Sequence, residues 1–224
     1  MRNAEKVILA LDVDSLAKAR KFIRQLGAAI TVFKIGSVLF TAAGPEVIDR
    51  VRRAGSRVFL DLKFHDIPNT VAGAVRMATR RGVFMLTVHT CGGREMLIAA
   101  AGAAADEAKK AGVKPPLVVG VTVLTSDKAG ADTRKEVVRR ARLAQDCGLG
   151  GVVCSVQEAA AVRKACGKKF IIVTPGIRPA GAGVQDQKRV ATPQAALAAG
   201  ADYLVVGRPI LEAQDPLQAV NNLF

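Results

Sequence analysis

The chain has 224 residues, half of them hydrophobic, which suits one domain with a large aliphatic core over residues 1–224. Its formal net charge is +14, but the positive residues are spread over most of the sequence, as on a solvated basic surface. No apolar run approaches the roughly 18 to 20 residues that a membrane span needs. One Tyr and no Trp offer little for stacking nucleic-acid bases. These features argue against a membrane protein and against a specific nucleic-acid binder.

The N-terminus and the cysteines predict a cytoplasmic protein. Residues 1–6 run directly into a strand-like segment and lack the apolar core and cleavage site of a signal peptide. The four cysteines form no CxxC pair and show no repeated spacing, so we expect free thiols in a reducing compartment. They are Cys91, Cys147, Cys154 and Cys166.

Eight short apolar runs predict strands. Most are nearly continuous in hydrophobicity rather than alternating, which is typical of strands buried on both faces of a parallel sheet. In chain order they are Val7–Asp12, Thr31–Gly36, Arg57–Leu62, Phe84–His89, Leu117–Val123, Gly151–Cys154, Lys169–Thr174 and Tyr203–Gly207.

Longer stretches with helical spacing follow these strands. They carry the usual start and stop signals, such as Asp14 or Ser15 as a cap before the first helix and Pro45 and Pro193 in first turns. The expected helices are Ser15–Leu26, Pro45–Ala54, Asn69–Arg81, Arg94–Ala111, Thr133–Cys147, Gln157–Cys166, Thr192–Ala199 and Ile210–Val220.

Strands alternating with helices, without a break in composition, predict one closed α/β barrel of the (β/α)8 or TIM type. A doubly wound open sheet is the alternative, although such a sheet usually has fewer strands. Two long Gly-rich loops, Thr125–Asp132 and Pro175–Arg189, follow the fifth and seventh predicted strands. Barrel enzymes carry out their chemistry on the face where such loops lie, so both loops are candidate lids.

The third predicted strand ends in two opposite charges. Asp61 and Lys63 are two residues apart, so we expect both to face the barrel mouth while Leu62 packs outward under the helices. Lys34, on the neighbouring strand, and Asp66, in the following loop, would complete an array of two cations and two anions. A purely structural ion-pair network at the barrel end is the alternative interpretation.

Other polar residues also follow strand ends. Gly207 and Arg208 close the eighth strand, and Gly176 and Arg178 lie in the preceding loop, where barrels often hold phosphate groups. The remaining strand-end residues are Asp12, His89, Thr125 and Ser155.

His65 and His89 could act as general acids or bases, but hydrogen-bonded structural histidines are the commoner case. No His, Cys, Asp or Glu cluster has metal-site spacing. No Ser or Cys lies in a nucleophile-elbow pattern either.

Residues 61–70, DLKFHDIPNT, closely resemble the signature of the orotidine 5'-monophosphate decarboxylases. The resemblance runs nearly end to end, through segments 9–12, 33–36, 87–89 with Gly92, Gly93 and Met96, 123–126, 174–179, 186–189 and 206–210. It implies a homodimeric decarboxylase that converts orotidine 5'-monophosphate to UMP and carbon dioxide without metal or cofactor.

The resemblance also implies a role for each charged residue of the array. Lys63 would protonate C6 of the pyrimidine, and Asp61 would lie against the departing carboxylate. Lys34 would bridge the array and bond the ribose, which Asp12 would also bind. Asp66 would reach into the partner subunit's site.

The remaining implied contacts complete the substrate site. Thr70 would reach the partner's site together with Asp66, and Thr125 would lie by the base and ribose. The phosphate contacts would be Arg178, Gln187, Gly207 and Arg208. One position departs from the family's pattern, because Gln185 stands where relatives usually have a glycine that permits unusual backbone angles.

Three other functions fit parts of this pattern. A Mg2+-dependent decarboxylase of keto-sugar phosphates shares the Asp-x-Lys-x-x-Asp spacing, but it should have a glutamate metal ligand in place of Lys34. A sugar-phosphate isomerase or cyclase would need an acid/base pair across a proton-transfer path. A basic nucleic-acid binder would show strong, salt-dependent binding.

Overall fold

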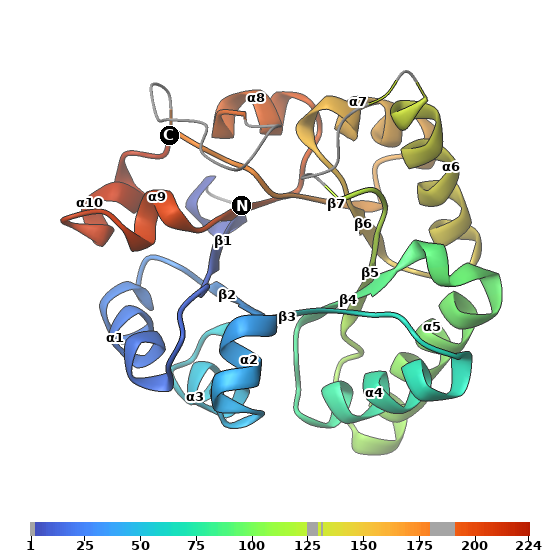
Figure 1. Ribbon diagram of the computed structural model, residues 1–224, viewed down its shortest axis with the longest axis horizontal. Coiled ribbons are helices and arrows are strands. Elements are labelled where there is room, and N and C mark those ends of the chain that lie inside the picture. The colour runs from blue at the N-terminus through green and yellow to red at the C-terminus, as the bar shows by residue number, and fades with distance from the viewer. Residues whose placement is uncertain (1–2, 125–129, 131, 180–190) are drawn as a thin grey trace.

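The computed structural model describes residues 3–124, 130, 132–179 and 191–224. Eight parallel strands form a closed barrel in chain order, with β8 hydrogen-bonded to β1, and the helices lie outside the ring of strands (Figure 1). This confirms the predicted TIM barrel and excludes the open doubly wound sheet. The strands are Val7–Ala10 (β1), Val32–Gly36 (β2), Arg57–Phe64 (β3), Met85–His89 (β4), Leu117–Val121 (β5), Gly151–Val153 (β6), Ile171–Thr174 (β7) and Tyr203–Val206 (β8).

The helices cover the outer face of the strands. They are Leu16–Leu26 (α1), Ser37–Ala43 (α2), Glu46–Arg53 (α3), Pro68–Arg80 (α4), Gly93–Ala111 (α5), Thr133–Asp146 (α6), Val156–Cys166 (α7), Pro193–Ala198 (α8), Arg208–Leu211 (α9) and Pro216–Asn221 (α10), with 3-10 turns at Asn3–Lys6 (η1) and Thr90–Gly92 (η2). None of the helices in the described ranges is long and apolar enough to cross a membrane.

Two helical segments differ from the sequence prediction. Helix α2 had not been predicted, because its β-branched and aromatic residues have weak helix propensity. The predicted helix Ile210–Val220 is instead two short helices. Pro216 cannot continue a helix, and the Asp215 carboxylate caps α10 by accepting hydrogen bonds from the backbone N–H groups of Leu217 at 2.9 Å and Gln218 at 3.1 Å.

The core has two layers, because successive residues of each strand face opposite sides. Ile8, Phe59 and Val173 belong to the cluster that fills the barrel interior. Leu9 and Leu60 alternate with them and pack outward with the helices. Both layers exclude water, and this explains why the strands appear in the sequence as continuous apolar runs. The four cysteines form no disulfide, as expected.

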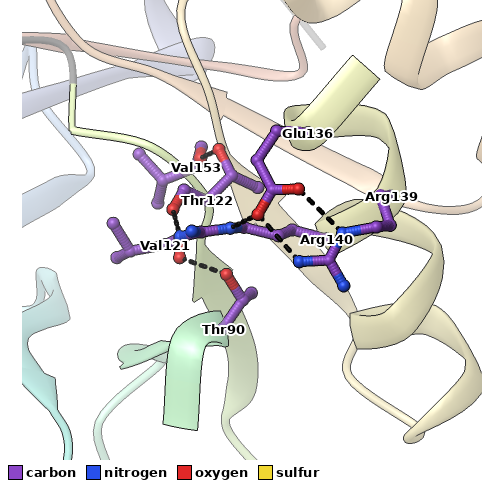
Figure 2. Close-up of polar contacts among 7 residues, drawn as sticks. All are labelled: Thr90, Val121, Thr122, Glu136, Arg139, Arg140 and Val153. Atoms are coloured by element: carbon purple, nitrogen blue, oxygen red, sulfur yellow. Dashed lines mark hydrogen bonds and ion pairs between the residues drawn. The ribbon is translucent and has the colours of Figure 1, made fainter. Parts of the chain in front are cut away.

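Side chains tie the carboxyl end of β5 to its neighbours (Figure 2). The Thr90 hydroxyl donates to the Val121 carbonyl at 2.7 Å, and the Thr122 hydroxyl donates to the Val153 carbonyl at 2.8 Å. The Arg140 guanidinium of α6 donates to the Thr122 carbonyl at 2.7 Å. These bonds fix the point from which the chain leaves β5 toward residue 125.

Glu136 holds this arginine in place. Its carboxylate accepts from Arg140 Nε at 2.6 Å and from Arg139 Nε at 2.7 Å, as Figure 2 shows. Hydrogen bonds from Arg139 and Arg140 outweigh a small effect of burial and lower the pKa of Glu136 from 4.5 to about 2. The negative charge of Glu136 therefore persists in acid and helps to orient Arg140 toward the Thr122 carbonyl.

Glu136→Gln is expected to lower the free energy of unfolding near pH 7 by on the order of 1 kcal/mol, because the pair is partly exposed and screened. The folded pKa lies below the ordinary value, so this stabilisation is complete above about pH 4.5 and is lost as the pH falls toward 2. Urea unfolding of both proteins between pH 3 and 7 measures the difference. A difference that did not change with pH would contradict the assigned role of the Glu136 charge.

Candidate active site

A cavity of about 510 Å³ opens at the carboxyl ends of the strands, a size typical of small-molecule sites. Its walls combine apolar residues of the barrel interior, such as Phe59 and Val173, with charged residues at the strand ends. Two sets of residues that include charged side chains line this cavity. The first set is Asp12, which follows β1, with Lys34 of β2 and Asp61 and Lys63 of β3, and the second set, which follows β7 and β8, is Gly176, Arg178, Gly207 and Arg208.

The first group forms a chain of alternating charges. Lys34 Nζ lies 2.9 Å from Asp12 Oδ1 and 3.6 Å from Asp61 Oδ2. Lys63 Nζ lies 2.9 Å from the same Asp61 oxygen. The order Asp12, Lys34, Asp61, Lys63 thus places each ammonium beside a carboxylate. Lys34 is more enclosed than Lys63, with only 8% of its surface exposed.

A single chain brings together three of the four residues of the predicted array, and Asp12 rather than Asp66 is the fourth. Asp66 is exposed, and its carboxylate accepts from the backbone N–H of Ile67 at 2.6 Å. No ion pair between described residues includes Asp66. Thr70 is exposed as well, so this segment faces away from the cavity of its own chain.

Asp61 has a lowered pKa in spite of its burial. Burial alone would raise the pKa of this carboxyl, whose side chain is 13% exposed. The ammonium groups of Lys34 and Lys63 outweigh that effect, and hydrogen bonds from Lys63 and Thr87 act in the same direction. Asp61 is therefore an anion at neutral pH, held in a largely enclosed position.

The backbone brings Lys63 to Asp61 by an irregular path that the sequence did not predict. Lys63 has a φ of 52°, and it is the only non-glycine residue with positive φ in the described part of the chain. The register between β3 and β4 shifts between Leu60 and Phe64. Asp61 and Lys63 both line the cavity, as their spacing predicted, but an irregular backbone rather than a regular strand brings them there. Leu62 packs toward the outer core, as expected.

Gly36 provides space for the pair formed by Lys34 and Asp12. A Cβ atom at this position would lie 3.0 Å from Lys34 Nζ and 3.3 Å from Asp12 Oδ1. Its backbone angles are extended, so the need for glycine here is steric rather than conformational. A side chain at residue 36 would require the Lys34 ammonium and the Asp12 carboxylate to move by a few tenths of an ångström.

The arginine side of the cavity is closed at its base by backbone hydrogen bonds. The Arg178 N–H donates to the Ala191 carbonyl at 2.9 Å, and the Ala191 N–H donates to the Gly176 carbonyl at 3.2 Å. Arg178 is 7% exposed, and both Arg178 and Arg208 line the cavity. Glu212 also lines the cavity, so Arg178 and Arg208 supply two positive charges against its one negative charge, and this side suits a phosphate, as the sequence suggested. Gln187, Gln185 and Thr125 lie outside the described residues.

Two histidines and one serine lie near the strand ends without lining the cavity. The rings of His65 and His89 are 5.7 Å apart, and His65 Nδ1 is 4.0 Å from Cys91 Sγ. Burial lowers the pKa of His89, and electrostatic interactions with His65 and Lys63 lower it further, which favours a neutral ring. Ser155 is a helix cap. It accepts from the N–H of Gln157 at 3.2 Å, and α7 begins at the next residue.

Sequence reasoning missed Thr87. This residue is fully buried in β4, and its hydroxyl contacts both Asp61 and the Lys63 backbone. The available signal was a polar residue inside the apolar run Met85–Val88, but β-branched threonine is also common in ordinary strands. No group of three His, Cys, Asp or Glu side chains that could hold a metal ion occurs within the described ranges.

Comparison with known proteins gives consistent matches over nearly the whole chain. Residues 5–223 match the model of the orotidine 5'-phosphate decarboxylase / HUMPS family. The orotidine 5'-phosphate decarboxylase of Moorella thermoacetica is 50% identical, over 98% of this chain and 90% of its own length. The crystal structure of the orotidine 5'-phosphate decarboxylase from Lactobacillus acidophilus is 34% identical, with a TM-score of 0.83 over 98% of this chain and 97% of that one. The corresponding enzyme structure from Pyrococcus horikoshii has a TM-score of 0.77 at 26% identity, over 97% and 96% of the two chains.

Lys34→Met is expected to raise the pKa of Asp61, because one of the two ammonium groups that offset its burial is lost. Carboxyl-carbon NMR titration of the folded protein measures this shift. Lys18→Met is the matched control, since Lys18 pairs at 2.8 Å with the exposed Asp14 and should affect only that carboxyl. An unchanged Asp61 titration in Lys34→Met would show that the 3.6 Å contact has no electrostatic effect.

Proposed function

The chain belongs to the orotidine 5'-phosphate decarboxylase / HUMPS family, and we propose that its cavity binds orotidine 5'-monophosphate with the pyrimidine beside Lys63 and the phosphate near Arg178 and Arg208. The chain is a lyase that releases carbon dioxide from this nucleotide to form UMP, the last step of de novo pyrimidine biosynthesis. The observation that carries the assignment of residues is the alternating chain of Asp12, Lys34, Asp61 and Lys63 at the cavity wall.

The reaction needs electrostatic help at one carbon atom. Cleavage of the bond between C6 and the carboxylate leaves the electron pair on C6, and the pyrimidine ring hardly delocalises it. We propose that side chains alone supply the chemistry, with no imine or cofactor as an electron sink. The Lys63 ammonium would stabilise the developing negative charge and then donate a proton to C6.

Asp61 would act on the group that leaves. It is an enclosed anion, and a substrate carboxylate placed beside it would be repelled until carbon dioxide departs. Lys34 would keep Asp61 charged and bond the ribose, and Asp12 would contact the ribose from the other side of Lys34. Each anion of the array thus has a neighbouring cation before substrate arrives.

The phosphate is remote from the reacting carbon, and its binding energy can hold the base in place. Arg178 and Arg208 supply positive charge on that side of the cavity, and Gly207 lines the cavity beside Arg208. We also assign Gln187 to the phosphate and Thr125 to the base and ribose, on the resemblance to the family alone.

We propose a homodimer in which Asp66 and Thr70 complete the partner's site. Both residues are exposed, and Ile67 between them is 66% exposed, as expected for a segment that packs against another subunit. No nucleic acid or membrane takes part in this proposal. We place the enzyme in the cytoplasm, where its four cysteines would remain thiols.

A Mg2+-dependent reaction on a keto-sugar phosphate fits the cavity less well. A divalent cation bound to Asp61 would face the ammonium groups of Lys34 and Lys63, both within 4 Å of that carboxylate. The repulsion would weaken metal binding strongly in an enclosed site. Conversion of orotidine 5'-monophosphate in the presence of EDTA distinguishes the two reactions, and strict dependence on Mg2+ would contradict our assignment.

Lys63→Ala is expected to lower turnover at least about 1,000-fold, since it removes both the charge beside C6 and the proton donor. Binding of UMP should remain measurable, because the phosphate side of the cavity is untouched. Ultraviolet absorbance follows turnover, and calorimetry follows UMP binding. Lys18→Ala serves as a control on the exposed surface of α1. Substantial turnover by Lys63→Ala would exclude Lys63 as the central residue.

Mixing inactive variants tests the shared site. Lys63→Ala and Asp66→Ala subunits should each have little activity alone. Mixed dimers would contain one site with both residues intact, so unfolding and refolding the two together should restore up to about a quarter of wild-type activity. If the mixture stays as inactive as its components, Asp66 does not act across a subunit boundary.

A further inference from the structure

The bulge in β3 faces a single buried side chain of β4. Between Leu60 and Phe64 the chain of β3 advances four residues, while its partner β4 advances only two, from Leu86 to Val88. Thr87 is therefore the one β4 residue opposite Asp61, Leu62 and Lys63. It is fully buried, with no exposed surface.

The Thr87 hydroxyl connects two functional groups of the site. It accepts a hydrogen bond from the Lys63 backbone N–H at 2.8 Å and donates its own hydrogen to Asp61 Oδ1 at 3.0 Å. The other oxygen of the same carboxylate, Oδ2, lies 2.9 Å from Lys63 Nζ. Asp61 and Lys63 are thus joined twice, once through their side chains and once through the Thr87 hydroxyl.

We propose that Thr87 is a positioning residue for the decarboxylation, which holds the Asp61 carboxylate and the Lys63 backbone in their reactive arrangement. This inference rests on the proposed function of Asp61 and Lys63. Thr87 does not line the cavity, so its effect passes through the two residues that it bonds.

Two physical constraints require such a residue. Lys63 is held at a φ of 52°, a conformation that costs an ordinary residue energy and persists only when its surroundings fix it. The bulge also removes the Lys63 N–H from the regular ladder of β3 and β4, and a buried N–H without a partner is costly. The Thr87 hydroxyl satisfies that donor and so stabilises the irregular backbone.

The hydrogen bond to Asp61 resists the motion that the reaction would otherwise provoke. When the substrate carboxylate arrives, repulsion favours rotation of Asp61 away from it or protonation of Asp61. Thr87 holds Oδ1 while Lys34 and Lys63 hold Oδ2, so the carboxylate plane is fixed from both sides. The donated N–H from Lys63 also polarises the hydroxyl and strengthens its bond to the carboxylate.

The test compares Thr87→Val, which replaces the hydroxyl with a methyl group of similar size, with Thr87→Ser, which retains the hydroxyl. Thr87→Val is expected to lower kcat about 10- to 100-fold, the effect of losing a hydrogen bond to a charged group, and to change KM much less. Thr87→Ser should recover most of the lost kcat. If Thr87→Val does not fold, Thr87→Ala makes the same deletion with less steric demand.

The control is Thr79→Val. Thr79 is 1% exposed in α4, and its hydroxyl donates one hydrogen bond, to the Val75 carbonyl at 2.8 Å. The Thr79→Val variant loses a comparable buried hydrogen bond that involves neither Asp61 nor Lys63, so it should be less stable but keep the wild-type kcat. A wild-type protein that does not convert orotidine 5'-monophosphate would refute the proposed function rather than the contacts of Thr87.

A pH measurement separates positioning from simple packing and needs no turnover. The titratable groups around Asp61 are Lys34 and Lys63, with Asp12 beyond Lys34 and His89 nearby. Loss of the hydrogen bond to the charged carboxylate should raise the pKa of Asp61 in Thr87→Val, seen by carboxyl-carbon NMR, and move the acidic limb of the kcat profile to higher pH. Unchanged kcat and unchanged Asp61 titration in Thr87→Val, or a Thr87→Ser as impaired as Thr87→Val, would overturn the proposal.

Discussion

An enclosed Asp61 carboxylate stands between the ammonium groups of Lys34 and Lys63, and the chemistry of the barrel mouth depends on this balance. Burial of Asp61 alone would favour its neutral form, which could not repel a substrate carboxylate. Two cations reverse that preference, at distances of 3.6 and 2.9 Å. Without Asp61, the largely enclosed Lys34 ammonium would keep only the Asp12 carboxylate as its partner. The two lysines therefore keep Asp61 ionised at neutral pH.

The fold serves this unit by fixing the points from which its side chains extend. Parallel strands of a closed barrel end at one face, so residues far apart in sequence, such as Asp12 and Asp61, line one cavity. Space and backbone shape are equally restricted there. Gly36 leaves room for the Lys34 ammonium, and the bulge at Lys63 returns this side chain to Asp61. Thr87 satisfies the backbone donor that the bulge displaces.

The side of the cavity at the ends of β7 and β8 carries arginines rather than alternating charges. Arg178 and Arg208 supply positive charge there, which we assign to the phosphate, a group that does not react. Backbone hydrogen bonds hold Arg178, and Arg208 is the first residue of α9. In the function that we propose, binding energy comes from the phosphate side, whereas the residues at the ends of β1 to β3 stabilise the charge that develops at the reacting carbon.

The sequence by itself determined the barrel and most of the charged site. Continuous apolar runs require strands buried on both faces, and charges at their ends require a common, partly polar mouth, so local patterns suffice for both. Tertiary structure decided what depends on contacts between distant residues. Asp12 rather than Asp66 completes the array of one chain, and a bulge opposite Thr87 sets the position of Lys63. Strand register and the partners of buried hydrogen bonds arise only when the strands pair, and no local pattern records them.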